Sequence, residues 1–187
     1  MSFWRGLWGR FDPGKGQEYL IEALALLRHE GLPIEILLLG EETKGEEGRY
    51  LPYLKKQVQQ KGLEPFVHFR PFTRQIAQAY ASLDVFCMTS KAETFGMVTV
   101  EAMASGLPVI GTASGGTPEL IQAEETGILI PPLDAKALAR AIAYLYQNPE
   151  KAQRMGLSAQ ASVEARFHYR VQVAQTQALL QKLMERL

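Results

Sequence analysis

Several features that would each define a class of protein are scarce in this sequence of 187 residues. Its one cysteine, Cys87, cannot form a disulfide within the chain, which excludes a disulfide-stapled scaffold. Cys87 lies in the apolar run "LDVFCMTS", so we expect it to pack in the core as a small hydrophobic side chain. No run reaches the roughly 20 apolar residues of a transmembrane helix, and "MSFWRGLWGR" lacks the pattern of a secretory signal. These absences predict a cytoplasmic protein.

An excess of either charge is missing too, because 20 Lys and Arg residues balance 20 Asp and Glu residues. Such a chain has no general electrostatic basis for binding nucleic acid or an anionic membrane, so we expect neither partner. An anion would have to be held by a local group of residues. The metal motif H-E-x-x-H, paired C-x-x-C and the nucleophile turn G-x-S-x-G are also absent. We therefore expect no bound metal and no cofactor.

What the sequence does contain is a regular alternation of short apolar runs and longer amphipathic ones. The short runs are continuously apolar, as in strands that are covered on both faces, and they span residues 3–8, 34–40, 67–69, 84–89, 108–112 and 127–131. The helical patterns span residues 16–31, 49–62, 74–83, 97–106, 117–122 and 134–149. This alternation predicts an α/β fold, a doubly wound, Rossmann-like parallel sheet of about six strands with helices on both faces. We expect residues 1–187 to form one domain.

The carboxyl-terminal region, about Pro149 to Leu187, is expected to be helical throughout. Its end carries an apolar stripe of Leu179, Leu180, Leu183 and Leu187. Because the polar face of this stretch is not densely basic, we expect it to pack on the body of the fold and not on a membrane.

The loop from Gly40 to Arg49, "GEETKGEEGR", is the most polar part of the chain. We interpret it as a solvated connection in preference to a functional acidic patch. It nevertheless follows a strand, and doubly wound sheets bind ligands at the carboxyl ends of their strands.

A first candidate phosphate site is "GRFDPGKG", from Gly9 to Gly16, which follows the first strand and opens the first long helix. Its glycines allow a sharp turn, and the helix start offers free N–H groups and a positive dipole. Arg10 and Lys15 add two cations suited to an oxyanion. The stretch nearly matches a P-loop, but Gly16 stands where that loop needs a Ser or Thr for Mg²⁺, and Pro13 removes a donor. The residues favour a diphosphate site without an obligatory metal over a P-loop or a plain glycine turn.

A second candidate site is "AETFGMVTVEAMASG", in which a helix is expected to start at Gly96. The amides near Phe95, Gly96, Met97 and Val98 should be unpaired there and available to an anion. Glu101 lies about one turn into this helix, on the side of Met97.

Glu101 is the single ionisable residue between Thr94 and Pro118, and burying a carboxylate without a partner is costly. Below a bound phosphate it could accept hydrogen bonds from the two hydroxyls of a ribose, while Glu93 would face whatever extends beyond the phosphates. The alternative is a buried carboxylate satisfied by backbone amides or an arginine. A ligand-facing role for the glycine loop Ser114 to Gly116 is a weaker possibility, since a helix start explains that stretch.

Together, "GRFDPGKG" and Glu93-x₇-Glu101 within "ETFGMVTVEAMASGLPVIGTASGGTPEL" resemble the carboxyl-terminal, donor-binding domain of the group 1 glycosyltransferases, GT4-type retaining enzymes of GT-B architecture. The similarity runs from about Gly9 to Leu187. It implies binding of a nucleotide-diphosphate sugar and retaining transfer of a hexosyl group. The implied catalytic residues are Glu93 at the transferred sugar and Arg10 and Lys15 at the diphosphate. The implied donor-binding residues are Gly9, Phe72 near the base, Phe95, the amides of Gly96, Met97 and Val98, and Glu101 at the ribose.

A GT-B enzyme also has an amino-terminal domain that carries the acceptor contacts, and this sequence shows none. By the resemblance, that domain is the missing partner, any membrane contact would be made through it, and the chain alone should be inactive in transfer. Two other functions stay open: a non-catalytic nucleotide-binding or interaction module, and a sugar-nucleotide epimerase of GT-B architecture. A phosphorylase would need a cofactor-bearing lysine, for which the sequence around Lys91 gives no signal.

Overall fold

The computed structural model describes residues 3–43 and 48–185. Its centre is one six-stranded sheet in which every pairing is parallel. The strands are β1 (Phe3–Trp8), β2 (Ile34–Leu39), β3 (Val67–Arg70), β4 (Val85–Met88), β5 (Val109–Thr112) and β6 (Gly127–Ile130). The α-helices are α1 (Gln17–His29), α2 (Tyr50–Gln60), α3 (Ile76–Ala81), α4 (Met97–Ala104), α5 (Thr117–Leu120), α6 (Ala135–Gln147), α7 (Pro149–Phe167) and α8 (Tyr169–Met184), with two 3₁₀ turns at η1 (Pro13–Lys15) and η2 (Glu64–Phe66). The predicted α/β fold is confirmed.

The strand order is β3-β2-β1-β4-β5-β6, so the chain reverses its direction of winding between β1 and β4. Loops that leave the carboxyl ends of these two strands diverge to opposite sides of the sheet. A crevice opens at such a point, and open α/β sheets bind their ligands there. The order therefore directs attention to the loops after β1 and β4.

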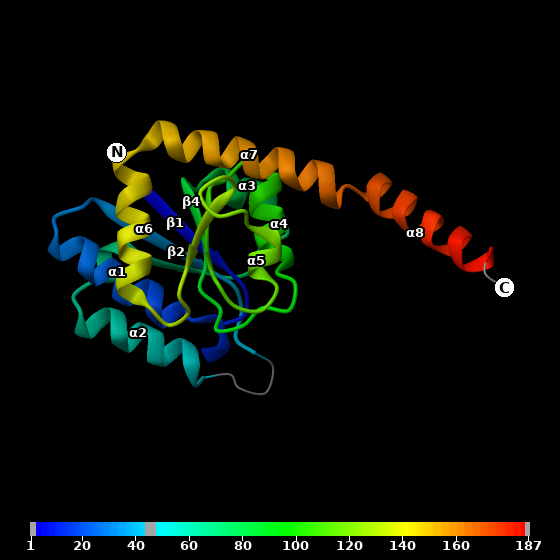
Figure 1. Cartoon of the computed structure of the whole chain (residues 1–187). Coiled ribbons are helices and arrows are strands. Elements are labelled where there is room, and N and C mark those ends of the chain that lie inside the picture. The colour runs from blue at the N-terminus through cyan, green and yellow to red at the C-terminus, as the bar shows by residue number, and fades with distance from the viewer. Residues whose placement is uncertain (1–2, 44–47, 186–187) are drawn as a thin grey trace.

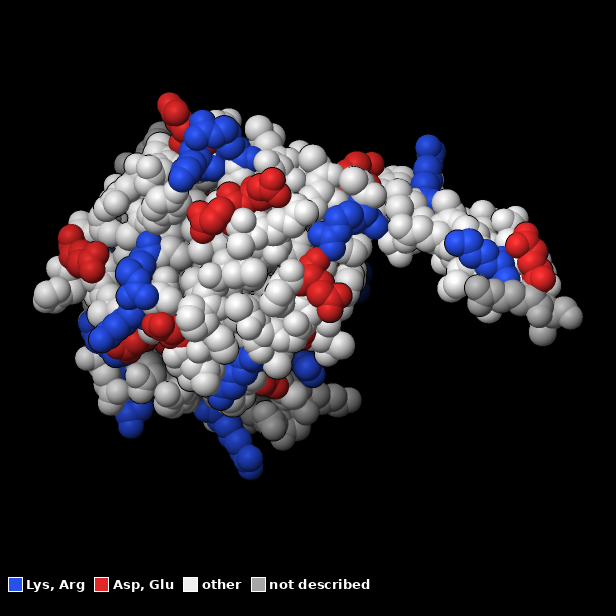
Figure 2. All heavy atoms as spheres, in the orientation of Figure 1, with Lys and Arg blue, Asp and Glu red and all other residues white. Residues whose placement is uncertain are grey.

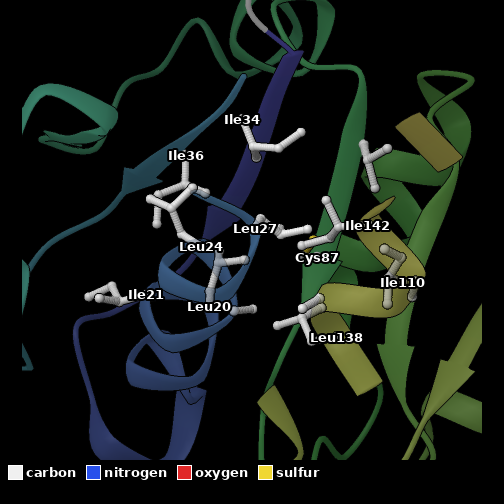
Figure 3. Close-up of a cluster of buried hydrophobic side chains, with 14 of the residues drawn as sticks. Leu20, Ile21, Leu24, Leu27, Ile34, Ile36, Cys87, Ile110, Leu138 and Ile142 are labelled. Carbon is white, nitrogen blue, oxygen red and sulfur yellow. The ribbon is translucent and has the colours of Figure 1, made fainter. Parts of the chain in front are cut away.

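One face of the sheet is covered by α1, α2 and α6 (Figure 1). Leu20, Leu24 and Leu27 of α1 are buried, as their spacing predicted, and pack with Leu138 and Ile142 of α6 (Figure 3). Cys87 lies in the same cluster and is fully buried, so the expected packing role of this residue is confirmed.

The opposite face is covered by α3, α4, α5 and part of α7. Tyr80 of α3, Met103 of α4 and Val163 of α7 are buried there with Phe86 of β4. Because β4 is buried along its whole length, with Phe86 on this side and Cys87 on the other, it runs through the middle of the core.

The carboxyl-terminal region departs from the sequence-based expectation in two ways. It is two helices, because the chain leaves helical geometry at His168, where ψ is 137°. The second helix, α8, projects from the body (Figure 1), and none of its described residues is buried. Leu179, Leu180 and Leu183 are exposed, so the prediction that their stripe packs on the body is wrong; Leu187 lies outside the described residues. The predicted helical conformation of the stripe is confirmed, but helical spacing does not indicate what covers an apolar face.

Charged side chains of both signs are interspersed on the face drawn in Figure 2 and do not gather there into a patch of one sign. Among the described helices, none combines the length and the apolar character needed to span a bilayer.

Candidate functional site

The segment after β1 forms the tight turn that the three glycines predicted. Gly9 has φ of 146°, and the Asp12 carboxylate caps η1 by accepting a hydrogen bond of 2.7 Å from the Gly14 amide. Gly16, with φ of 69°, then starts α1, and a Cβ at this position would lie 2.2 Å from the carbonyl oxygen of Thr89. A side chain cannot be accommodated at that distance, so Gly16 is required by the close approach of the loop after β4.

Two hydrogen bonds tie this glycine loop to the loop after β4. The Lys91 amide donates to the Gly14 carbonyl at 2.9 Å, and the Thr89 hydroxyl donates to the Lys15 carbonyl at 2.8 Å. The backbone of Lys15 is therefore held beside residues that lie more than 70 positions further along the chain.

The first contact between predicted site residues is an ion pair. Nζ of Lys15 lies 2.7 Å from Oε2 of Glu93, and the Ser90 hydroxyl lies 3.4 Å from the same oxygen. The Lys15 and Glu93 side chains are 25% and 17% exposed, so both are accessible to a ligand and only partly shielded from water. The sequence predicted different targets for these two residues, the diphosphate and the sugar.

The backbone of Glu93 is supported by the glycine loop after β5. The Gly116 amide donates to the Glu93 carbonyl at 2.7 Å, and a Cβ on Gly115 would lie 2.2 Å from the same oxygen. The structure thus gives these two glycines a supporting role at Glu93, which the sequence did not reveal.

The amino terminus of α4 begins at Gly96, whose φ of 88° suits glycine. Its carbonyl accepts hydrogen bonds from the Thr99 and Val100 amides at 2.9 and 3.2 Å. Within the described part of the chain the amides of Met97 and Val98 meet no acceptor. The predicted helix start is therefore present, with free N–H groups and the positive end of the helix dipole. Anion binding at this start stays a prediction.

Glu101 has a partner that the sequence did not predict. The Tyr80 hydroxyl lies 3.0 Å from Oε2 of Glu101 and 3.1 Å from the Val98 carbonyl. Among the described residues, neither a backbone amide nor an arginine bonds this carboxylate. The alternative expectation, that one of these two groups satisfies it, is therefore wrong. Burial and the neighbouring Glu101 raise the pKa of Tyr80 well above its ordinary value, which keeps the phenol protonated.

A cavity of about 550 Å³ lies between the segments at the carboxyl ends of β1, β2 and β3 and the first turns of α3 and α4. Its wall is mostly apolar with a few polar groups, the usual character of small-molecule sites. The lining residues are Gly9, Arg10, Leu39, Gly40, Glu41, Phe72, Thr73, Arg74, Ile76, Val98 and Glu101.

The predicted site residues fall into two groups. Gly9, Arg10, Phe72, Val98 and Glu101 line the cavity, and Phe72 is 59% exposed. The others are outside that lining: Lys15 and Glu93 form the ion pair, Gly96 and Met97 begin α4, and the Phe95 ring packs edge-on against Phe167 with centroids 5.7 Å apart.

Other residues of the wall were missed by the sequence analysis. Glu41 follows β2 and Gly40 packs closely on Gly9, where a Cβ would be 1.8 Å from the Gly9 carbonyl oxygen. Their position directly after a strand was a signal of a ligand site, but the polarity of the loop favoured its interpretation as a solvated connection. Residues 44–47 of that loop lie outside the described residues. Arg74, between β3 and α3, and Ile76, the first residue of α3, carried no signal of a ligand site in the sequence.

No group of three or more His, Cys, Asp or Glu side chains that could hold a metal ion occurs in residues 3–43 and 48–185. Independence from metal stays a prediction.

A parallel sheet with reversed winding at β1 and β4, two glycine-started helices and a cavity beside them define the chain as a Rossmann-like α/β domain with a candidate anion and nucleoside site. The family model "Glycosyl transferases group 1" matches residues 7–162. The chain belongs to the group 1 glycosyltransferase family.

Curated relatives agree with this family. The D-inositol 3-phosphate glycosyltransferase of Streptomyces scabiei is 32% identical over 84% of this chain and 36% of its own length. A GDP-mannose-dependent alpha-(1-6)-phosphatidylinositol monomannoside mannosyltransferase of Mycobacterium tuberculosis is 30% identical over 86% of this chain and 42% of its own. The chain therefore spans well under half the length of these two relatives.

Solved structures agree in fold. Anabaena Alr3699/HepE in complex with UDP-glucose superposes with a TM-score of 0.88 and 33% identity, over 98% of this chain and 49% of that one. The sucrose-phosphate synthase of Thermosynechococcus elongatus gives a TM-score of 0.87 and 32% identity over 100% of this chain and 46% of that one. These matches favour neither the epimerase nor the non-catalytic module.

Proposed function

We propose that this chain binds a nucleotide-diphosphate sugar at the carboxyl ends of β1 and β4 and presents it for retaining transfer of a hexosyl group to an acceptor. The observation that carries the proposal is that Arg10, Val98 at the free start of α4 and Glu101 line one mostly apolar cavity. The Lys15–Glu93 ion pair joins the loops after β1 and β4 next to these segments. Each of these groups matches one part of such a donor.

The diphosphate would lie between the glycine loop and the start of α4. Arg10 and Lys15 supply the positive charge, and the amides of Met97 and Val98 supply donors that are already oriented. As the glycosidic bond breaks, negative charge builds up on the departing diphosphate, and fixed donors stabilise it most effectively because they need no reorganisation.

The nucleoside would occupy the cavity. Glu101 would accept hydrogen bonds from the ribose hydroxyls, and the exposed ring of Phe72 with the side chain of Ile76 would pack against the base. Glu93 would face the sugar on the other side of the phosphates, where Lys15 now neutralises it.

The acceptor would be held by a second domain. The chain covers 49% of Alr3699/HepE and 36% of the Streptomyces relative, so half or more of those proteins has no counterpart in it. We expect the amino-terminal domain of a GT-B enzyme to supply the acceptor contacts, and we expect the chain alone to bind donor without transferring sugar.

Calorimetric titration tests the donor site. UDP, GDP and ADP, and their glucose- and mannose-linked forms, are titrated into the wild-type chain and into Glu101→Ala. Micromolar to millimolar binding by at least one nucleotide, weakened about tenfold or more by Glu101→Ala, is expected because hydrogen bonds to a charged group contribute about 1.5 to 3 kcal/mol each. Absence of binding by every nucleotide would refute the donor site, and binding unaffected by Glu101→Ala would refute its placement.

A mixing experiment tests the enzyme. Hydrolysis and transfer of radiolabelled sugar are measured with the chain alone and after addition of a separately produced amino-terminal domain from a relative. Transfer that appears only in the mixture supports a donor-binding half of an enzyme, whereas full transfer by the chain alone contradicts it.

A further inference from the structure

Tyr80 occupies an unusual position for a polar residue. It is 1% exposed and packs among apolar side chains, with its ring edge-on to Phe86 at 5.8 Å between centroids. Its hydroxyl nevertheless reaches the wall of the cavity, because it touches Glu101, which lines that wall. A buried ring thus carries a polar group to the edge of the candidate site.

The hydroxyl has one hydrogen, and both the Val98 carbonyl and the Glu101 carboxylate lie within its reach. The Val98 carbonyl lies in α4, where it accepts the helical hydrogen bond from the amide of Ala102, four residues further on. The carboxylate is charged and is the stronger acceptor, so the hydrogen is directed to Oε2 of Glu101.

This bond leaves the rest of the carboxylate available. A carboxylate offers about four lone-pair positions, and Tyr80 uses one of them. Oε1 of Glu101 meets no hydrogen-bond partner among the described residues. Without the Tyr80 hydroxyl, the three side-chain torsions of Glu101 would be restrained only by packing in the wall of the cavity.

We propose that Tyr80 is a positioning residue, which fixes the Glu101 carboxylate so that its free lone pairs can accept hydrogen bonds from two vicinal hydroxyls of a nucleotide ribose. This inference rests on the proposed donor site and adds a residue that strengthens its preference for ribose. Tyr80 itself does not touch the ligand. Because the raised pKa of Tyr80 keeps its hydroxyl protonated, this positioning persists across the physiological pH range.

The test compares Tyr80→Phe with the wild-type chain by calorimetry, using UDP, GDP and ADP, each beside its 2′,3′-dideoxy analogue. The wild type should prefer the ribose form by about tenfold or more, since two hydrogen bonds to a charged carboxylate are lost with the hydroxyls. Tyr80→Phe should reduce this preference at least about threefold while leaving the affinity for the dideoxy form unchanged. A purely structural role would weaken both forms equally, and that result would overturn the proposal.

Tyr50→Phe is the matched control. Tyr50 is also buried, and its hydroxyl donates to a carboxylate, that of Glu18, on the opposite face of the sheet and outside the cavity lining. It should lose comparable stability and keep the full ribose preference. In a Glu101→Ala background, Tyr80→Phe should change the preference no further, because the two residues act through one contact.

The outcomes separate this proposal from the site on which it rests. If no nucleotide binds, the donor site and the positioning role both fall. If Glu101→Ala abolishes the ribose preference and Tyr80→Phe leaves it intact, the positioning role alone is overturned.

Should Tyr80→Phe fail to fold, 3-fluorotyrosine placed at position 80 gives a second measurement. Its ¹⁹F resonance should shift with the ribose nucleotide more than with the dideoxy form. Equal shifts with both would overturn the proposal.

Discussion

Nζ of Lys15 lies 2.7 Å from Oε2 of Glu93, joining the loops after β1 and β4 across the crevice at the centre of the sheet. The residues of the pair are 78 positions apart in sequence and both are partly exposed. In the proposed site the lysine serves a diphosphate and the glutamate a sugar. The ion pair must therefore open when the donor binds, so that Lys15 contacts the diphosphate and Glu93 the sugar.

Lys15→Ala should weaken binding of the tightest-binding nucleoside diphosphate by about tenfold, because it removes a charge-assisted hydrogen bond and leaves Glu93 unneutralised beside the phosphates. Lys61→Ala is the matched control, since Lys61 forms an ion pair with Glu22 away from the cavity. Calorimetric affinities for both variants check the prediction, and equal effects of the two substitutions would contradict it.

Glu93→Gln should act in the opposite direction on the free diphosphate. Loss of the carboxylate frees Lys15 and removes a negative charge, so affinity for the diphosphate should rise by about two- to fivefold, the scale of a partly exposed ion pair. The additional affinity for the sugar-linked form should fall. Parallel titrations with both forms measure this, and weaker binding of the free diphosphate would argue against the exchange of partners.

Gly115→Ala should destabilise the fold by about 2 kcal/mol or more, because φ is 59° and the new Cβ would meet the Glu93 carbonyl oxygen at 2.2 Å. Gly62→Ala is the control for backbone strain alone, with φ of 64° and no atom within 4 Å of a Cβ; it should cost about 1 kcal/mol. Urea unfolding gives both free energies. Equal losses would mean that contact with Glu93 contributes nothing.

A chain ending at His168, without α8, should keep its free energy of unfolding within about 1 kcal/mol, because α8 buries none of its described side chains. Thermal and urea unfolding of the shortened chain check this. A loss of several kcal/mol would show that α8 packs on the body in solution.

The strands and most helices were predictable because each carries its own local signal. Leu20, Leu24 and Leu27 repeat with helical period, and Gly31 follows the helix with φ of 77°. The continuous apolar run around Cys87 predicted a strand covered on both faces, which β4 is.

The contacts within the site were less accessible, because they join residues distant in sequence. Chemical type marked out Lys15, Glu93 and Glu101 as site residues, yet nothing in the spacing shows that Lys15 reaches Glu93. The role of the Tyr80 hydroxyl was not predictable for another reason. A tyrosine within an apolar helical pattern is expected in the core, and its ring does lie there. Only the packing of α3 on α4 places its polar end at Glu101.

The two hydrogen bonds that tie Gly14 and Lys15 to Lys91 and Thr89 also bear on how fast a ligand could bind. They fix the backbone of the glycine loop during folding, so the entropy cost of ordering this loop does not weaken ligand binding. The backbone of this loop is therefore already in place when a diphosphate enters, and the adjustment that the proposed exchange requires of it is rotation of the Lys15 and Glu93 side chains. For this part of the site, association should be governed by diffusion and charge, and the lifetime of the complex by the contacts made afterwards.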